Sequence, residues 1–115
     1  MNQKLYQSLD EIIPVVTAHN QGEKFVFLSN EDTQTALTQF AFGKFLPGEE
    51  CASHLHSTME ECFYFIDGKG EYIVNDTIYF IRPKCFLRIP ANTLHALKAT
   101  GDKPLTFVYF GVATT

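Results

Sequence analysis

The sequence predicts an all-β domain in which antiparallel strands form a sandwich or a barrel. Three observations support this fold class. Short runs of β-branched and aromatic residues recur along the chain, residues that favour turns separate these runs at nearly regular spacing, and helical periodicity is scarce. Strands that follow one another without intervening helices are typical of antiparallel sandwiches and barrels.

The one signal for the start of a helix lies near the N-terminus. Ser8 and Glu11 have the spacing of a capping box, in which the two residues satisfy free backbone amides of the first turn. Pro14 cannot continue a helix, because it lacks an amide hydrogen and its ring clashes with the preceding turn. We therefore expect at most a short helical turn here.

The predicted strands are the segments rich in β-branched and aromatic residues. In chain order they are residues 24–28, 35–46, 52–56, 62–66, 70–74, 77–81, 86–89 and 105–112. Gly, Pro, Asn, Asp and Ser, which favour turns, lie between them. The breaks fall at residues 29–32, 47–48, 67–70, 75–76, 83–84, 90–92 and 101–104.

Length and composition limit the organisation of the chain and its partners. A chain of 115 residues can bury the core of one domain, and we expect residues 1–115 to form that single domain. There are 13 acidic and 9 basic side chains, with no run of lysines and arginines of the kind that binds nucleic acid or an anionic membrane. We expect neither partner.

The cysteines and the apolar segments predict a cytoplasmic protein. Cys51, Cys62 and Cys85 are an odd number at irregular spacing, which favours reduced thiols over a disulfide framework or a zinc ribbon. Residues 1–13 lack the apolar core of a signal peptide, and the longest apolar run, residues 62–66, is too short to span a bilayer.

Two histidines and a carboxylate follow one another in a pattern suited to a metal ion. His54 and His56 are two residues apart, so in a strand both imidazoles would leave the same face. If the next strand continues from Glu61, that carboxylate shares a face with Phe63 and Phe65. A carboxylate facing an apolar interior is costly unless it is paired or coordinated, which is what a metal would supply.

A third histidine follows a predicted turn. His95 lies three residues after Asn92, just past the turn at residues 90–92, where it can supply another imidazole. His19, beside Asn20 and Gly22, is expected to be a loop residue without a role in the site.

These residues resemble the two motifs of the cupin family. The first motif is a Gly, five residues, His-x-His, three or four residues, a Glu, six residues and a Gly, and it is matched over about residues 48–68 by Gly48, His54, His56, Glu61 and Gly68. The second, Pro-x-Gly-x-x-His, is matched within about residues 84–99 by Pro90 and His95, with Asn92 in place of the glycine. Asn tolerates the left-handed backbone of such a turn. Lys84 and Ala99 replace a usual Gly and a usual Asn.

The resemblance implies a fold and a cofactor. The fold is a double-stranded β-helix, also called a jelly-roll or cupin barrel. The cofactor is one divalent transition metal ion, held by His54, His56, Glu61 and His95. Such ligands suit Fe, Mn, Ni, Co or Zn, and the ligand set alone does not choose between them. Four ligands leave an octahedral ion two positions for substrate, dioxygen or water.

Several residues are candidates for the wall of a substrate pocket. Phe63 and Phe65 are expected to line the inner wall. Arg88 could bind a substrate carboxylate or phosphate, although a surface ion pair is the commoner role of a strand arginine. Tyr72, Tyr79 and Tyr109 could each offer a hydroxyl, although packing is the commoner role of such tyrosines. Gln39 and Lys44, on the long strand before Gly48, are open to both interpretations.

The strand at residues 62–66 is expected to be covered on both of its faces. Its outer residues Cys62, Tyr64 and Ile66 are apolar, whereas a half-exposed strand should alternate between apolar and polar residues. Either the N-terminal strand or another subunit covers this face. Because small cupins commonly pack sheets together as homodimers, we expect a homodimer.

The resemblance implies a metal-dependent enzyme that acts on a small polar or anionic molecule. The family includes dioxygenases, isomerases and epimerases, decarboxylases and lyases. One carboxylate against a divalent ion leaves a net positive charge, which favours an anionic or chelating oxygen ligand. The alternative is a non-catalytic module that binds or senses a sugar or another small molecule. A metal-free structural protein is the third interpretation.

Overall fold

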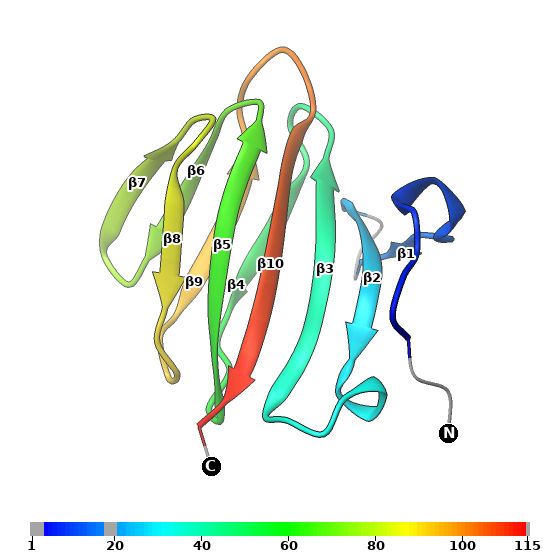
Figure 1. Ribbon diagram of the computed structural model, residues 1–115. Helices are drawn as coiled ribbons and strands as arrows, with labels where there is room; N and C mark the ends of the chain where they lie inside the picture. The colour runs from blue at the N-terminus through cyan, green and yellow to red at the C-terminus, as the bar shows by residue number, and fades with distance from the viewer. Residues whose placement is uncertain (1–3, 18–20, 115) are drawn as a thin grey trace.

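Two antiparallel β-sheets face each other in the computed structural model of the chain, which describes residues 4–17 and 21–114 (Figure 1). One sheet has the strand order β1-β2-β3-β10-β5-β8, and the other has the order β4-β9-β6-β7. Every strand pairing in both sheets is antiparallel within these residues. This arrangement confirms the all-β prediction and the double-stranded β-helix barrel.

Ten strands make up these sheets in the described ranges. They are β1 (Val15–Val16), β2 (Glu23–Ser29), β3 (Leu37–Phe45), β4 (Glu50–His54), β5 (Met59–Asp67), β6 (Gly70–Val74), β7 (Thr77–Ile81), β8 (Phe86–Ile89), β9 (His95–Ala99) and β10 (Leu105–Ala113). The helical elements in the same ranges are two single 3-10 turns, η1 (Leu9–Glu11) and η3 (Asn30–Asp32). Neither is long and apolar enough to cross a membrane.

The predicted helical turn near the N-terminus is confirmed. The Ser8 hydroxyl accepts a hydrogen bond from the Asp10 amide at 3.3 Å, and the Glu11 carboxylate accepts one from the Ser8 amide at 3.1 Å. This is the predicted capping box, and η1 ends at Glu11, before Pro14.

Two strands lie where the sequence predicts none. β1 has only two residues and pairs with the edge of β2, so no hydrophobic pattern could mark it. β9 carries one large apolar residue, Leu97, among alanines, a lysine and a histidine. It forms because β4 and β6 hydrogen-bond to its two edges, with His95, Leu97 and Ala99 buried on one face. Tertiary pairing outweighs its weak strand propensity.

The core between the sheets is largely aromatic. Phe45, Phe65, Tyr72 and Phe107 are each exposed by 5% or less, and Phe63 by 6%. The Phe107 ring occupies the space beside Gly43, where a Cβ would lie 2.4 Å from its ring carbons. Glycine at this position therefore lets an aromatic ring pack directly against the backbone of β3.

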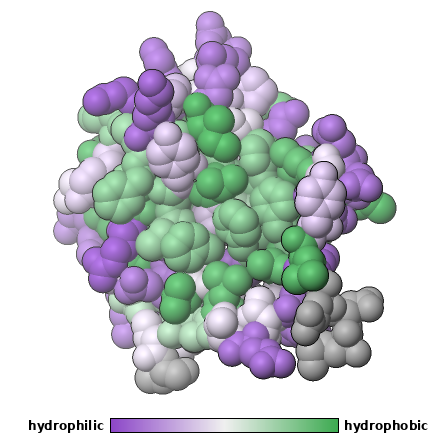
Figure 2. Space-filling model, in the orientation of Figure 1, coloured by the Kyte–Doolittle hydropathy of each residue, from purple (hydrophilic) through white to green (hydrophobic). Residues whose placement is uncertain are grey.

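The outer face of the six-stranded sheet is also apolar, as Figure 2 shows in the orientation of Figure 1. Phe86 is 71% exposed, Tyr64 46%, Ile66 45% and Phe110 38%. The N-terminal strand does not cover these side chains, because β1 extends the sheet beyond β2, far along the strand order from β5 and β8 (Figure 1). The N-terminal segment lies beside Phe25 and Phe42 at the other end of the sheet and leaves these four side chains exposed within the described chain, so covering by the N-terminal strand does not explain their apolar character.

Candidate metal centre

Three histidines converge from two paired strands and the loop that follows one of them. His54 ends β4 and lies opposite His95, which begins β9, while His56 lies two residues beyond β4. The ring centroids of His54 and His95 are 4.2 Å apart, those of His54 and His56 are 5.0 Å apart, and those of His56 and His95 are 5.7 Å apart. One ring nitrogen from each lies within 4.8 Å of the other two, so the trio could hold one metal ion.

His54 and His56 do not converge by alternation along a single strand, because β4 ends at His54. We expected one strand over residues 52–56 to direct both imidazoles to one face, but β4 ends at His54 and its register against β9 is irregular. A backbone contact places His56 instead. Its carbonyl accepts a hydrogen bond from the Asn92 amide at 2.8 Å, which ties this loop to the turn before His95. Asn92 has φ +61, the left-handed conformation expected for a glycine substitute.

Glu61 brings a carboxylate to the same place from β5. It is buried, with 6% of its surface exposed, on the face of β5 that also carries Phe63 and Phe65. Its Oε1 atom lies 3.6 Å from Nε2 of His56 and 3.6 Å from Nε2 of His95. Ligand atoms at right angles around one ion lie about 3 Å apart when each bond is about 2.1 Å. A small side-chain shift would let Glu61 join the ligand set.

The hydrogen bonds of the imidazoles fit a metal ion. Nδ1 of His95 lies 2.8 Å from the Thr93 carbonyl, and Nδ1 of His54 lies 2.9 Å from the Ala52 carbonyl. A carbonyl only accepts, so Nδ1 carries the hydrogen and Nε2 keeps a free lone pair. Nε2 of His95 is fully buried and has no hydrogen-bond partner among the described residues, since 3.6 Å to Glu61 is too long. A metal cation bound by Glu61 would also give the lone pair of this His95 nitrogen a partner.

Burial and charge set the protonation of the groups around this centre. Burial lowers the pKa of His56, and the Glu61 carboxylate only partly opposes this effect. Burial also disfavours charge on His95, but the Glu61 carboxylate and the Thr93 carbonyl outweigh it and raise the pKa. Burial, and then the charge of Glu61, raise the pKa of Tyr72, Tyr109 and the Cys51 thiol. These three side chains are therefore neutral hydrogen-bond donors at neutral pH.

A cavity of about 370 Å³ opens from the metal centre between the sheets. His54, His56 and Glu61 form one part of its lining, and Val15, Val16 and Thr17 contribute another part from the N-terminal strand. Aromatic and apolar side chains make most of the remaining wall. They are Phe45, Phe63, Tyr72, Leu97, Phe107 and Tyr109.

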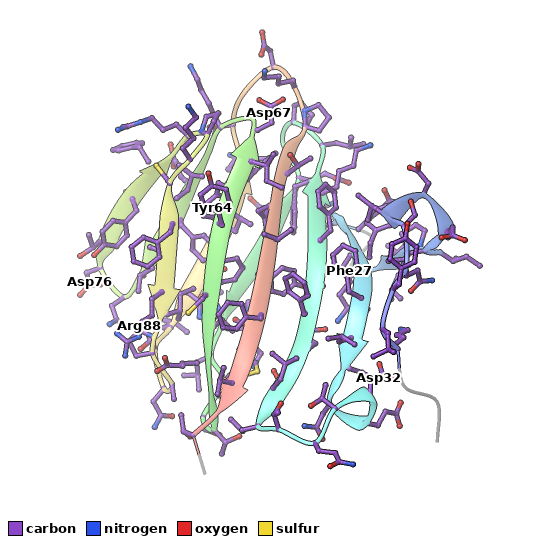
Figure 3. All side chains as sticks on the ribbon, in the orientation of Figure 1. Phe27, Asp32, Tyr64, Asp67, Asp76 and Arg88 are labelled. Atoms are coloured by element: carbon purple, nitrogen blue, oxygen red, sulfur yellow. The ribbon has the colours of Figure 1, made fainter. Side chains whose placement is uncertain are left out.

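The predicted pocket residues separate into two groups. Phe63, Tyr72 and Gln39 line the cavity. Phe65 shares the inner face of β5 but is 0% exposed and packs against other rings, outside the lining. Arg88 lies on the outer face of β8, as Figure 3 shows, and its Nε is 3.2 Å from Oε1 of Glu60.

The placement of Arg88 follows from the register of β8 against β5. Arg88 lies opposite Cys62, and directly paired residues point to the same face. Its neighbour Ile89 takes the inner face and is 2% exposed. The apolar residue beside Arg88 was therefore a usable signal that the arginine faces outward.

Tyr109 also lines the cavity, whereas Tyr79 and Lys44 are outside its lining, and Lys24 lines it without having been predicted as a site residue. Lys24 begins a predicted strand, and its face depends on pairing that the sequence does not display. Tyr109 belongs to a run that is apolar at most positions, so alternation does not reveal its face. His19 lies outside the described residues.

Comparison with known proteins places these features in one family. A family model described as a cupin domain matches residues 41–111, more than half of the chain. A curated relative, 5-nitrosalicylic acid 1,2-dioxygenase from Bradyrhizobium sp., is 32% identical over 93 residues. That alignment covers 73% of this chain and 44% of the relative, so the chain spans less than half of the relative's length.

Solved structures share the fold at lower sequence identity. A predicted oxalate decarboxylase from Thermotoga maritima has a TM-score of 0.88 at 23% identity, covering 95% of this chain and 99% of that one. The polyketide cyclase RemF from Streptomyces resistomycificus has a TM-score of 0.81 at 11% identity, covering 96% and 80%. The Cnp3 cupin domain from Schizosaccharomyces pombe has a TM-score of 0.81 at 15% identity, covering 95% and 74%.

Proposed function

This chain belongs to the cupin domain family, and from that premise we propose that it is a metal-dependent enzyme with dioxygenase-type chemistry on a small anionic or polar molecule. One observation carries the proposal. The buried Nε2 of His95 has no hydrogen-bond partner in the described chain, and it lies beside two further imidazoles and a carboxylate at a cavity with aromatic walls. The relative from Bradyrhizobium, named as a dioxygenase, supports this choice among the reactions of the family.

The side chains of the site would have distinct roles in such a reaction. His54, His56, His95 and Glu61 would hold the ion, which when bound supplies Lewis acidity and, for an oxygenase, redox chemistry. The rings of Phe63 and Phe107 exclude water from the cavity and offer a flat apolar surface to the substrate. The phenols of Tyr72 and Tyr109 stay protonated beside Glu61, so they orient oxygen atoms by donating hydrogen bonds.

The alternative function is non-catalytic binding of a small molecule. It is favoured by the small number of acid-base groups in the cavity, where Glu61 and Glu23 are the acidic residues among the described lining residues and the register of β2 turns the Glu23 side chain to the other face. A redox metal needs no separate acid-base pair. Because oxygenase chemistry can proceed without such a pair, we prefer it both to an isomerase reaction and to binding without catalysis.

Metal analysis and turnover test the proposed function. Protein purified without chelator or nickel resin is expected to hold about one divalent ion per chain, since the ligands are preformed. Loaded with Fe(II) or Mn(II), it is expected to consume dioxygen with at least one of a panel of salicylates, catechols, thiols, diketones and sugar phosphates. Less than about a tenth of an ion per chain would contradict the metal site. Binding without turnover would favour the binding module.

We also propose that the chain forms a homodimer through the outer face of the six-stranded sheet. Tyr64 lies within this face, and replacing it with glutamate would place a charge in a dry interface. We expect sedimentation to show a dimer of the native chain at micromolar concentration and a monomer of Tyr64→Glu. Ile78→Glu is the matched control, because Ile78 is 48% exposed on β7 of the other sheet. A monomeric native chain would contradict the proposal.

A further inference from the structure

We propose that Lys24 and Gln39 form a carboxylate-binding subsite in the cavity, so that the molecule it accepts is a planar aromatic carboxylate. Lys24 lies on β2 opposite Gly43 of β3, and paired residues point to the same face of a sheet. Gly43 is buried and lines the cavity, so Lys24 also points inward. Its Nζ atom lies 3.3 Å from Oε1 of Gln39, which lines the cavity too.

The charge of Lys24 has no counter-charge within the described chain. The ion pairs found among those residues do not include Lys24. Glu23 precedes it on β2 and lies opposite Lys44, so the Glu23 side chain takes the other face. An ammonium group beside an apolar wall is costly without an anion. A ligand that carries a negative charge would remove this cost.

The geometry of the donors favours a carboxylate over a single-atom anion. The ammonium group has three hydrogens, and the one directed at Gln39 leaves two for a ligand. Gln39 accepts through its carbonyl oxygen, which leaves its amide NH₂ free to donate. Two adjacent donor groups can each bind one oxygen of a carboxylate.

The cavity wall defines the rest of the ligand. The rings of Phe63 and Tyr109 are stacked with their centroids 5.2 Å apart and an angle of 10° between planes. Phe63 also lies 5.8 Å from Phe107. Flat apolar walls of this kind fit a planar ring, and a volume of about 370 Å³ holds a small aromatic molecule. A ring held at Lys24 by its carboxylate would present its remaining substituents to the rest of the cavity, which includes the imidazoles.

This inference rests on the proposed function only in calling the ligand a substrate, because binding at Lys24 needs no metal. The test therefore measures benzoate and benzamide binding by calorimetry to the metal-free chain in the presence of a chelator. Benzamide has the same ring and size as benzoate but no charge. We expect Lys24→Met to weaken benzoate binding about tenfold or more and to leave benzamide binding unchanged, since only a charge-assisted contact is lost.

Lys44→Met is the matched control. Lys44 follows Gly43 on the same strand and lies opposite Glu23, so its side chain takes the outer face, and the variant should bind benzoate as the native chain does. Gln39→Leu should weaken benzoate less than Lys24→Met does, because it removes a neutral donor. Equal benzoate affinity in the native chain and Lys24→Met, or equal loss in Lys24→Met and Lys44→Met, would overturn the subsite.

Different results would contradict the carboxylate subsite and the metal-dependent function. If benzoate binds only after metal is added, the carboxylate goes to the metal centre, and the subsite is wrong while the metal-dependent function stands. If benzoate binds the metal-free chain through Lys24 but the purified protein holds no metal, the subsite stands and the enzyme proposal is wrong.

Discussion

Replacing His56 with alanine is expected to remove the metal ion from the purified chain and to abolish turnover. His56 supplies one of the three imidazoles of the centre. Changing a group that only supports a ligand typically costs about 10–100-fold in metal affinity, so losing a ligand should cost at least about 100-fold. His56 is a better test than His95, because its side chain is 38% exposed whereas that of His95 is 1% exposed. Loss of metal is then not confused with loss of folding.

Two neighbouring glutamates provide a matched pair for the same experiment. Glu61 has Oε1 3.6 Å from two imidazole nitrogens, whereas Glu60 points to the outer face and pairs with Arg88. We expect Glu61→Gln to weaken metal binding at least about tenfold and Glu60→Gln to leave it unchanged. Metal content should be measured by elemental analysis beside circular dichroism of each variant. Full metal content in His56→Ala, or equal losses in the two glutamine variants, would contradict the ligand set.

Replacing Phe65 with alanine is expected to lower the free energy of unfolding by about 3–5 kcal/mol, the cost of truncating a buried phenylalanine. Phe65 is 0% exposed, and its ring lies 5.4 Å from that of Phe107 and 6.1 Å from that of Phe63. Truncation would leave a void at the centre of the aromatic core, which neighbouring rings from different strands cannot easily fill. Urea denaturation followed by circular dichroism measures the change.

An exposed phenylalanine is the control for this prediction. Phe80 is 73% exposed on β7, and Phe80→Ala should change the free energy of unfolding by no more than about 0.5 kcal/mol. Phe65→Ala should leave the ligand affinity of the folded protein nearly unchanged, because Phe65 is outside the cavity lining. Native stability with lost ligand binding would instead make Phe65 a pocket residue.

The parts of the fold that depend on local chemistry could be predicted from the sequence. Strands β6, β7 and β8 have the predicted bounds, since turn residues fix each end. Asn75 and Lys84, in two of those turns, both have positive φ. β9 could not be predicted, because its residues have no strong strand propensity and its pairing partners are distant in sequence.

The candidate site also has some features that the local sequence predicts and others that depend on pairing between distant strands. The four proposed ligands were identified by motif spacing, and the structure brings all four together. The inward direction of Lys24 depends on its register against Gly43, which no local pattern encodes. The exclusion of Phe65 from the lining depends on depth within the barrel, and alternation along β5 gives only the face, not the depth.

The pairing of His54 with His95 links metal binding to the fidelity of folding. These residues face each other across two strands whose pairing shifts register between Cys51 and His54. A slip of one residue would turn one imidazole to the opposite face. An ion that needs both imidazoles would bind the native register alone and stabilise it by mass action. The cofactor would thus act as a check on the correct pairing of β4 with β9.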